Sequence, residues 1–185
     1  MLRPLFNSLV LSAIRFTIET MLQDQLQRPI RDLRISVTDR CNFRCGYCMP
    51  KDKYGRDHKF LQRKELLTFE EIETIAREFV DLGVVKIRLT GGEPLVRHDL
   101  EGLIERLRNI DGLEDLGLTT NASLLTAERA ARLRAAGIDR INISLDALDP
   151  VTFGQLNGVG YPVEDVLKGV DNALEAGFAQ VKINM

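Results

Sequence analysis

Apolar and polar residues alternate in five short stretches of the chain, at residues 33–38, 84–90, 115–121, 138–144 and 178–184. Three of these stretches follow a glycine and repeat one pattern, with apolar residues at the first, fourth and sixth positions after it and polar residues at the fifth and seventh. Successive side chains of a β-strand point to opposite faces of its sheet. The pattern therefore predicts five strands, each with one apolar and one polar face.

The segments between these strands carry the signals of helices. Thr68 and Glu71 form a capping box, and Gly83 is suited to end the helix that follows. Asp149 followed by Pro150 is a further signal for the start of a helix. We expect helices over residues 68–82, 99–109, 126–136 and 163–176. Alternating strands and helices predict an α/β fold with a parallel sheet.

Only one face of the predicted sheet is apolar, which distinguishes it from two familiar arrangements. A sheet with helices on both faces is apolar on both, and a closed eight-stranded barrel fills its interior with Val, Ile and Leu. The pattern here predicts a partial, TIM-like β/α barrel, with helices outside the sheet and a polar lumen. An antiparallel sheet with one solvated face is the alternative, which the helical connections and the repeated unit disfavour.

The polar faces of the predicted strands carry three cations, Arg34, Arg88 and Lys182. Inside a barrel, each cation would be destabilising by on the order of several kcal/mol unless an anion accompanied it. The fork of an arginine and the point charge of a lysine both suit phosphate groups. The expected ligand therefore carries several negative charges, as a polyphosphate does. The alternative is that Arg34 or Arg88 pairs inside the protein with Asp39, Glu93 or Asp146.

The length, composition and net charge of the chain limit its domain organisation and its partners. A length of 185 residues, with 44% of them hydrophobic, allows one domain, and a net charge of -2 predicts no general affinity for nucleic acid. No apolar stretch approaches the ~20 residues of a membrane-spanning helix. We expect residues 26–185 to form the domain and residues 1–25 to be an N-terminal extension. That extension is interpreted as a transit peptide, an amphipathic helix or, as we favour, a start placed too far upstream of Met21.

Three cysteines, Cys41, Cys45 and Cys48, follow the first predicted strand with the spacing C-x3-C-x2-C, and the chain has no others. A 4Fe-4S cube usually takes four thiolates, so three cysteines leave one iron free to bind a substrate or cofactor. Zinc held by the three thiolates and His58 is an alternative, although structural zinc sites usually pair their ligands in two separated units. An odd number of cysteines disfavours disulfides and indicates a reducing compartment, so we expect the cytoplasm.

The segment Cys41-Asn-Phe-Arg-Cys45-Gly-Tyr-Cys48 resembles the signature of the radical S-adenosylmethionine (SAM) superfamily, in which an aromatic residue precedes the third cysteine. The resemblance implies that the three cysteines hold a 4Fe-4S cluster and that Tyr47 lies against SAM. Residues 89–94 resemble the superfamily's GGEP motif, which implies that Gly92 contacts SAM. Ser144 stands at the family's position for the ribose or carboxylate of SAM.

Longer phrases resemble one branch of the superfamily, the GTP 3',8-cyclases of molybdenum cofactor biosynthesis. These phrases are residues 31–45, 86–94, 118–121 and 181–185. The resemblance implies an enzyme that converts GTP to 3',8-cyclo-7,8-dihydroguanosine triphosphate, with a 5'-deoxyadenosyl radical removing the ribose 3' hydrogen and no side chain acting as the main acid or base. It also implies that GTP is bound by Arg34, Arg88, Thr119 and Lys182.

The same resemblance implies partners for the chain. Besides GTP, they are an electron donor such as flavodoxin or ferredoxin, and a downstream cyclic pyranopterin monophosphate synthase. A homodimer is one expected assembly, and neither nucleic acid nor a membrane is an expected partner.

The chain also departs from the branch that it resembles. Ala122 stands where a glycine usually follows Thr-Thr-Asn, and the sequence stops at Met185, within the fifth predicted strand. The family's second three-cysteine 4Fe-4S cluster and its terminal Gly-Gly tail are not in this sequence, so we expect an incomplete fragment of uncertain activity. Two alternatives stay open: another radical SAM enzyme, of the peptide-maturase or haem-biosynthesis type, and a non-catalytic iron-sulfur or zinc-binding remnant.

Overall fold

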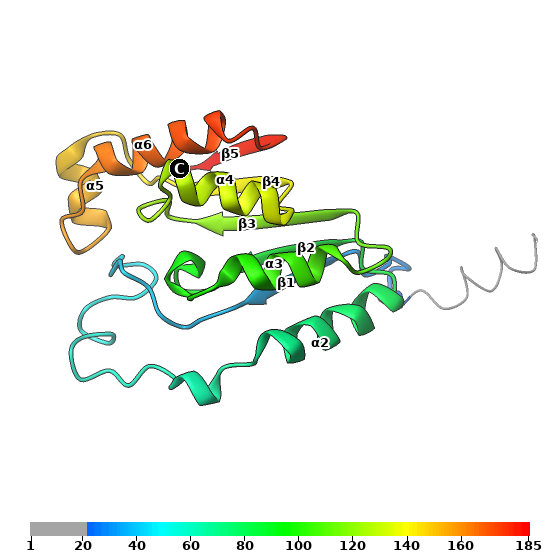
Figure 1. The fold of residues 1–185 in the computed structure, drawn as a ribbon. Coiled ribbons are helices and arrows are strands. Elements are labelled where there is room, and N and C mark those ends of the chain that lie inside the picture. Colours follow the sequence, from blue (N-terminus) through cyan, green and yellow to red (C-terminus); the bar gives the residue numbers. More distant parts are fainter. Residues whose placement is uncertain (1–21) are drawn as a thin grey trace, which may run out of the picture.

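Five parallel strands form one open sheet in a computed structural model of the chain, which describes residues 22–185 (Figure 1). The strands lie side by side in chain order: β1 (Asp32–Ser36), β2 (Lys86–Thr90), β3 (Asp115–Thr120), β4 (Arg140–Ser144) and β5 (Gln180–Asn184). All four pairings are parallel, which confirms the predicted α/β class. The antiparallel alternative is wrong.

Helices connect the strands and lie along one side of the sheet (Figure 1). The α-helices are α2 (Phe69–Asp81), α3 (Leu100–Arg108), α4 (Ala127–Ala136), α5 (Pro150–Leu156) and α6 (Val163–Glu175). Two short 3-10 helices, η1 (Arg63–Glu65) and η2 (Pro94–Val96), were not predicted from the sequence. No helix within residues 22–185 is both long and apolar enough to cross a bilayer.

The predicted helix boundaries follow from caps that the structure contains. The Thr68 hydroxyl accepts a hydrogen bond from the Glu71 backbone N–H at 3.2 Å, and the Glu71 carboxylate accepts one from the Thr68 N–H at 2.7 Å. Asp149 caps α5 in the same way, through the Thr152 N–H. Gly137, with a φ of 119°, ends α4 in the left-handed conformation that a side chain disfavours.

The hydrophobic core lies between the sheet and these helices. Ile87, Leu89, Leu118 and Ile141 of the strands are fully buried, as is Leu103 of α3. Because side chains alternate along each strand, the polar residues between them occupy the other face, which the helices do not cover. The open, one-sided sheet fits the predicted partial barrel.

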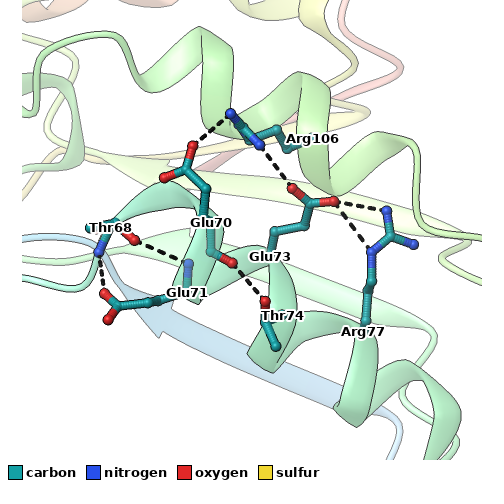
Figure 2. Close-up of polar contacts among 7 residues, drawn as sticks. All are labelled: Thr68, Glu70, Glu71, Glu73, Thr74, Arg77 and Arg106. Atoms are coloured by element: carbon teal, nitrogen blue, oxygen red, sulfur yellow. Dashed lines mark hydrogen bonds and ion pairs between the residues drawn. The ribbon is translucent and has the colours of Figure 1, made fainter.

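The outer surface of the helices is held by exposed ion pairs, which Figure 2 shows for α2 and α3. Arg106 of α3 binds Glu70 at 2.6 Å and Glu73 at 3.1 Å, and Arg77 binds Glu73 at 2.8 Å. Exposed pairs of this kind each stabilise a fold by less than about 1 kcal/mol. They are unconnected with the polar face of the sheet.

The expected N-terminal extension, residues 1–25, lies mostly outside the described residues. Within the described part, Gln23 and Pro29 form an isolated antiparallel bridge that precedes β1. The division at residue 25 stays a prediction.

Candidate functional site

The register of the sheet places the predicted substrate residues on one face. Arg34 of β1 stands opposite Arg88 of β2, while Thr119, Asn142 and Lys182 form a row across β3, β4 and β5. Their neighbours in sequence, among them Ile87 and Leu118, are buried against the helices, so these polar side chains lie on the uncovered face. The structure thus brings the four predicted residues to one polar face.

The three predicted cations of this face have no anionic partner among the described residues. None of the ion pairs formed within residues 22–185 includes Arg34, Arg88 or Lys182. The Nε atom of Arg88 is buried and makes no hydrogen bond. A buried donor without an acceptor is destabilising by about 1 to 3 kcal/mol, so an anionic ligand on this face would relieve a real deficit.

The carboxylates considered as internal partners are engaged elsewhere. The Asp39 carboxylate accepts a hydrogen bond from the Leu61 N–H at 2.7 Å, and the Asp146 carboxylate accepts one from the Tyr47 hydroxyl at 2.7 Å. Glu93 is occupied by neutral donors. Internal pairing of the cations with these three residues is therefore not what the fold contains.

The loop that carries Cys41, Cys45 and Cys48, here called the cysteine loop, follows β1 at the carboxyl-terminal edge of the sheet. The Arg44 side chain binds the backbone of this segment. The Arg44 guanidinium donates hydrogen bonds to the backbone carbonyls of Cys41 and Phe43, both at 2.7 Å, and to that of Tyr54 at 2.9 Å. The Phe43 ring is buried and packs on Phe153, with the two ring centroids 6.2 Å apart. One arginine and one aromatic anchor thus fix the backbone that carries the thiols.

All three cysteines carry free thiols, and two of them are partly buried. Burial raises the pKa of Cys41, and the nearby Glu93 carboxylate and the other two thiols raise it further. Burial likewise raises the pKa of Cys45, with Asp146 and Cys48 adding to the effect. The thiols therefore influence one another, and a bound metal would release their protons because only thiolates are ligands.

The thiols do not converge on one point. Within residues 22–185, no three His, Cys, Asp or Glu side chains gather closely enough to hold a single metal ion. The His58 ring packs instead between Tyr54 and Phe60, with centroids 4.7 and 4.5 Å away. A single-ion zinc site is thus not assembled, whereas thiolates that bind different irons of a cube need not share one point.

The glycine pair of the Gly-Gly-Glu-Pro turn lets it pack against the chain just before Cys41. The Gly92 N–H donates to the Thr38 carbonyl at 2.7 Å, and the Glu93 N–H donates to the Arg40 carbonyl at 2.8 Å. A Cβ atom on Gly92 would lie 2.2 Å from the Arg40 carbonyl oxygen. We expected these glycines to admit a ligand, and the structure shows that they also join β2 to the cysteine loop.

Glu93 is the buried centre of this junction, a role that the sequence did not reveal. Its carboxylate accepts hydrogen bonds from the Thr120 hydroxyl at 2.6 Å, the Asn121 N–H at 2.7 Å and the Leu95 N–H at 3.0 Å. Burial raises the pKa of Glu93 against the opposing effect of these donors. The Asn121 amide in turn donates to Asn42, next to Cys41, at 3.0 Å. The ends of β2 and β3 are thereby tied to the cysteine loop.

Tyr47 spans from the cysteine loop to the end of β4. The residue is 69% exposed, while its hydroxyl donates to Asp146, two residues beyond Ser144. Partial burial and the hydrogen bond to Asp146 both raise the pKa of Tyr47. The three residues predicted to bind SAM, namely Tyr47, Gly92 and Ser144, therefore lie at the same carboxyl-terminal edge as the thiols.

Comparison with known proteins places this site in a family. The family model described as the radical SAM superfamily matches residues 35–185. The chain belongs to the radical SAM superfamily. A 4Fe-4S cluster and SAM are the cofactors that this membership supports, and the three free thiols of one loop fit such a cluster.

Two curated relatives narrow the resemblance. The chain is 53% identical over 165 residues to a GTP 3',8-cyclase of Staphylococcus epidermidis, and 55% identical over 163 residues to a GTP 3',8-cyclase of Acidothermus cellulolyticus. These alignments cover 89% and 88% of this chain, but 48% and 45% of the relatives. The chain thus spans about half the length of the curated relatives that it matches.

Two solved structures share the fold of this chain. SuiB of Streptococcus suis, bound to precursor peptide SuiA, superposes with a TM-score of 0.66 at 21% identity, covering 94% of this chain and 35% of SuiB. The protein anSMEcpe with bound AdoMet superposes with a TM-score of 0.64 at 19% identity, covering 84% of this chain and 43% of that protein. At these identities, the likeness establishes the radical SAM barrel fold alone.

Proposed function

We propose that this radical SAM chain supplies the cofactor-binding and triphosphate-binding part of a GTP 3',8-cyclase, the enzyme of the first step of molybdenum cofactor biosynthesis. The observation that carries the proposal is a set of cations without an anionic partner in residues 22–185, Arg34, Arg88 and Lys182, on the polar face below the cysteine loop. The identity of about half to the two curated cyclases supports the same assignment.

Two neighbouring rows of side chains on the polar face bind GTP. Arg34 and Arg88 bind the triphosphate, because a guanidinium matches two phosphate oxygens at once. Thr119 and Lys182 lie in the next row toward the cysteine loop, where the Thr119 hydroxyl stands 3.5 Å from the Asn142 amide nitrogen. This row binds GTP closer to the cofactors. The ribose is thereby oriented toward the edge that carries the thiols.

The edge of the sheet holds the cofactors. Cys41, Cys45 and Cys48 bind the 4Fe-4S cluster, while Tyr47, Gly92 and Ser144 bind SAM. When bound, the cluster and SAM would supply radical chemistry at the ribose 3' position of the GTP that this chain holds. The side chains of the chain provide binding, orientation and exclusion of solvent rather than acid or base catalysis.

The proposal includes the surroundings of the enzyme. An electron donor such as flavodoxin or ferredoxin reduces the cluster, and a cyclic pyranopterin monophosphate synthase uses the product. The cytoplasm is the proposed location, because the thiols must stay reduced. We expect the second 4Fe-4S cluster only in the C-terminal part of such an enzyme, which this chain does not span.

GTP binding tests the proposal directly. We expect the full chain to bind GTP in anaerobic calorimetry, and Arg34→Ala, Arg88→Ala and Lys182→Ala to weaken binding by about 10- to 100-fold each, since each removes a charge-assisted contact. Arg77→Ala, on the outer side of α2, is the matched control and should bind as the parent does. GTP affinities that are equal in Arg88→Ala and the parent would contradict the proposal and favour a radical SAM enzyme for another substrate.

Turnover requires the remaining half of the enzyme. A hybrid that joins this chain to the C-terminal half of the Staphylococcus epidermidis relative should form 5'-deoxyadenosine and the cyclised nucleotide when reconstituted with iron and sulfide. Replacing Cys45 by Ala in the hybrid should abolish both products. Formation of 5'-deoxyadenosine with no cyclised GTP would retain the radical chemistry and reject the cyclase.

A further inference from the structure

A fourth basic residue, Arg140, lies in the same row as Arg34 and Arg88. The register pairs Arg34 with Arg88, Arg88 with Gly117, and Gly117 with Arg140, so one row crosses four strands. Ile141, next to Arg140, is fully buried against the helices, which places Arg140 on the polar face. Three arginines therefore lie in one row across the sheet, with Gly117 between Arg88 and Arg140.

The missing side chain of Gly117 is what lets Arg140 lie across the sheet. A Cβ atom at Gly117 would lie 3.2 Å from the Arg140 guanidinium carbon and 3.3 Å from its Nη1 atom. The guanidinium therefore rests above Gly117, in the direction of Arg88. A methyl group at this position would make a tight contact, so the Arg140 side chain would have to shift by a few tenths of an ångström.

Asp115 fixes Arg140 in this orientation. The Arg140 Nε atom lies 2.8 and 2.7 Å from the two Asp115 carboxylate oxygens. The pair is mostly buried, with 15% of the Arg140 side chain and 22% of the Asp115 side chain exposed. Both hydrogen bonds to Asp115 come from Nε, so neither Nη atom is used in this pair.

The row as a whole carries more positive charge than its partners neutralise. Asp115 is the one carboxylate that pairs with this row within residues 22–185, and it contacts Arg140. Arg88, on the other side of Gly117, has a buried Nε atom without an acceptor. Arginine forks that converge from two sides match the oxygens of a phosphate group.

We propose that Arg140 is a further phosphate-binding residue, which Asp115 orients above Gly117 and which acts with Arg88 on the terminal phosphates of the substrate. As it concerns GTP, this inference rests on the function proposed above. The row of Arg88 and Arg140 lies two residues farther from the cysteine loop than the row of Thr119 and Lys182. With the ribose held near the cofactors, the distal phosphates reach the arginine row, so Arg140 contributes to selectivity for triphosphates.

The experiment compares GTP with GMP on the full chain. Arg140→Ala should weaken GTP binding by about 10- to 100-fold, because a charge-assisted contact is lost, and should change GMP binding by less than about threefold. Arg140→Lys should fall between, since lysine keeps the charge without the fork. Arg77→Ala is again the control, and thermal unfolding verifies that each variant folds. Equal losses for GTP and GMP, or none, would overturn the role of Arg140.

Inorganic tripolyphosphate separates this inference from the proposed function. If the parent chain binds tripolyphosphate and Arg140→Ala does not, Arg140 binds phosphate even if GTP proves not to be the substrate. Gly117→Ala is a second variant, which keeps every charge but crowds the Arg140 guanidinium, and the resulting shift should weaken tripolyphosphate binding by about three- to tenfold. Should the parent bind no tripolyphosphate, or should both variants bind it as the parent does, the inference is wrong.

Discussion

The outer helix layer and the polar face of the sheet use the same charged residues in opposite ways. On the outside, Arg77 and Arg106 share the Glu73 carboxylate (Figure 2). On the polar face, Arg34 and Arg88 have no anionic partner within the described residues, although the Nε atom of Arg88 is buried. Exposed cations that are paired serve the fold, whereas a partly buried cation such as Arg88, without a partner within the described residues, indicates a ligand.

Carboxylates show the same contrast. Glu73 on the outer surface contacts two arginines, and the pKa of its carboxyl is lowered by them. Glu93 at the edge of the sheet contacts only neutral donors, and burial raises its pKa. The site is thus built from groups whose charges are incompletely compensated by the protein, as expected for a binding site for charged molecules.

The largest effect is expected from Glu93→Ala. This change leaves the Thr120 hydroxyl and the N–H groups of Leu95 and Asn121 without their acceptor, in a fully buried position. Unsatisfied buried donors each destabilise by about 1 to 3 kcal/mol, so we expect a total loss of about 3 to 5 kcal/mol in urea unfolding. Glu93→Gln keeps one acceptor oxygen and should lose less. A loss below that of an exposed ion pair would show that Glu93 does not hold the junction.

Alanine substitutions at Gly92 and Gly46, two glycines near the site, should differ in their effect on the free energy of unfolding. Both effects are smaller than that of Glu93→Ala. Gly92→Ala would place a methyl group 2.2 Å from the Arg40 carbonyl oxygen, which is backbone and cannot rotate away. Overpacking of this kind is destabilising by about 1 to 3 kcal/mol. Gly46→Ala, in the cysteine loop itself, meets nothing within 4 Å and should change the free energy of unfolding by less than about 0.5 kcal/mol. Equal effects of the two substitutions would contradict the close packing at Gly92.

Strand alternation was sufficient to predict the polar face from the sequence. Each strand reads as apolar and polar in turn, so the side on which Arg34, Arg88, Thr119 and Lys182 stand follows once the apolar side is buried. The helix ends were equally predictable, because caps such as Thr68 with Glu71 are local. Local and periodic signals carry this information without any knowledge of the tertiary fold.

The junction between strands and cysteine loop could not be predicted, because it depends on contacts between distant residues. Arg44 reads as an ordinary loop cation, yet it donates to three backbone carbonyls. Asn121 and Asn42 meet across 79 positions of sequence. Ala122 has a φ of 57°, in the left-handed region where glycine is favoured, and the glycine usual at this position in the branch that the chain resembles was the one indication of it. The tertiary fold alone brings such groups together.

Arg88→Met tests whether a side chain of the polar face contributes to GTP binding while it lowers the free energy of unfolding. Removal of a half-buried cation whose Nε lacks an acceptor should raise the free energy of unfolding by about 1 kcal/mol, while GTP binding is lost. Arg106→Ala on the outer surface should show the reverse, with a loss of less than about 1 kcal/mol and unchanged GTP binding. Urea unfolding and calorimetry measure the two quantities. If Arg88→Met were destabilising, Arg88 would have a partner in the fold.

The smallest effects concern pH, where Glu73 and Glu93 should act in opposite directions. The pKa of Glu73 is lowered by Arg77 and Arg106, so its contribution to stability is present above the ordinary value of 4.5 and is lost as the pH falls through its folded pKa. The pKa of Glu93 is raised, chiefly by burial, so its contribution is greatest below 4.5 and declines as the pH rises.

Urea midpoints between pH 3 and pH 8 for the parent, Glu73→Gln and Glu93→Gln resolve the two trends. The difference between the parent and Glu73→Gln should grow with pH and shrink with added salt, because exposed pairs are screened. As the pH rises, the parent should lose stability relative to Glu93→Gln. This difference should be insensitive to salt, because the carboxylate is buried. Trends of the same sign would mean that Glu93, like Glu73, is stabilised by a cation in the folded state, and the contrast between the two regions would fail for carboxylates.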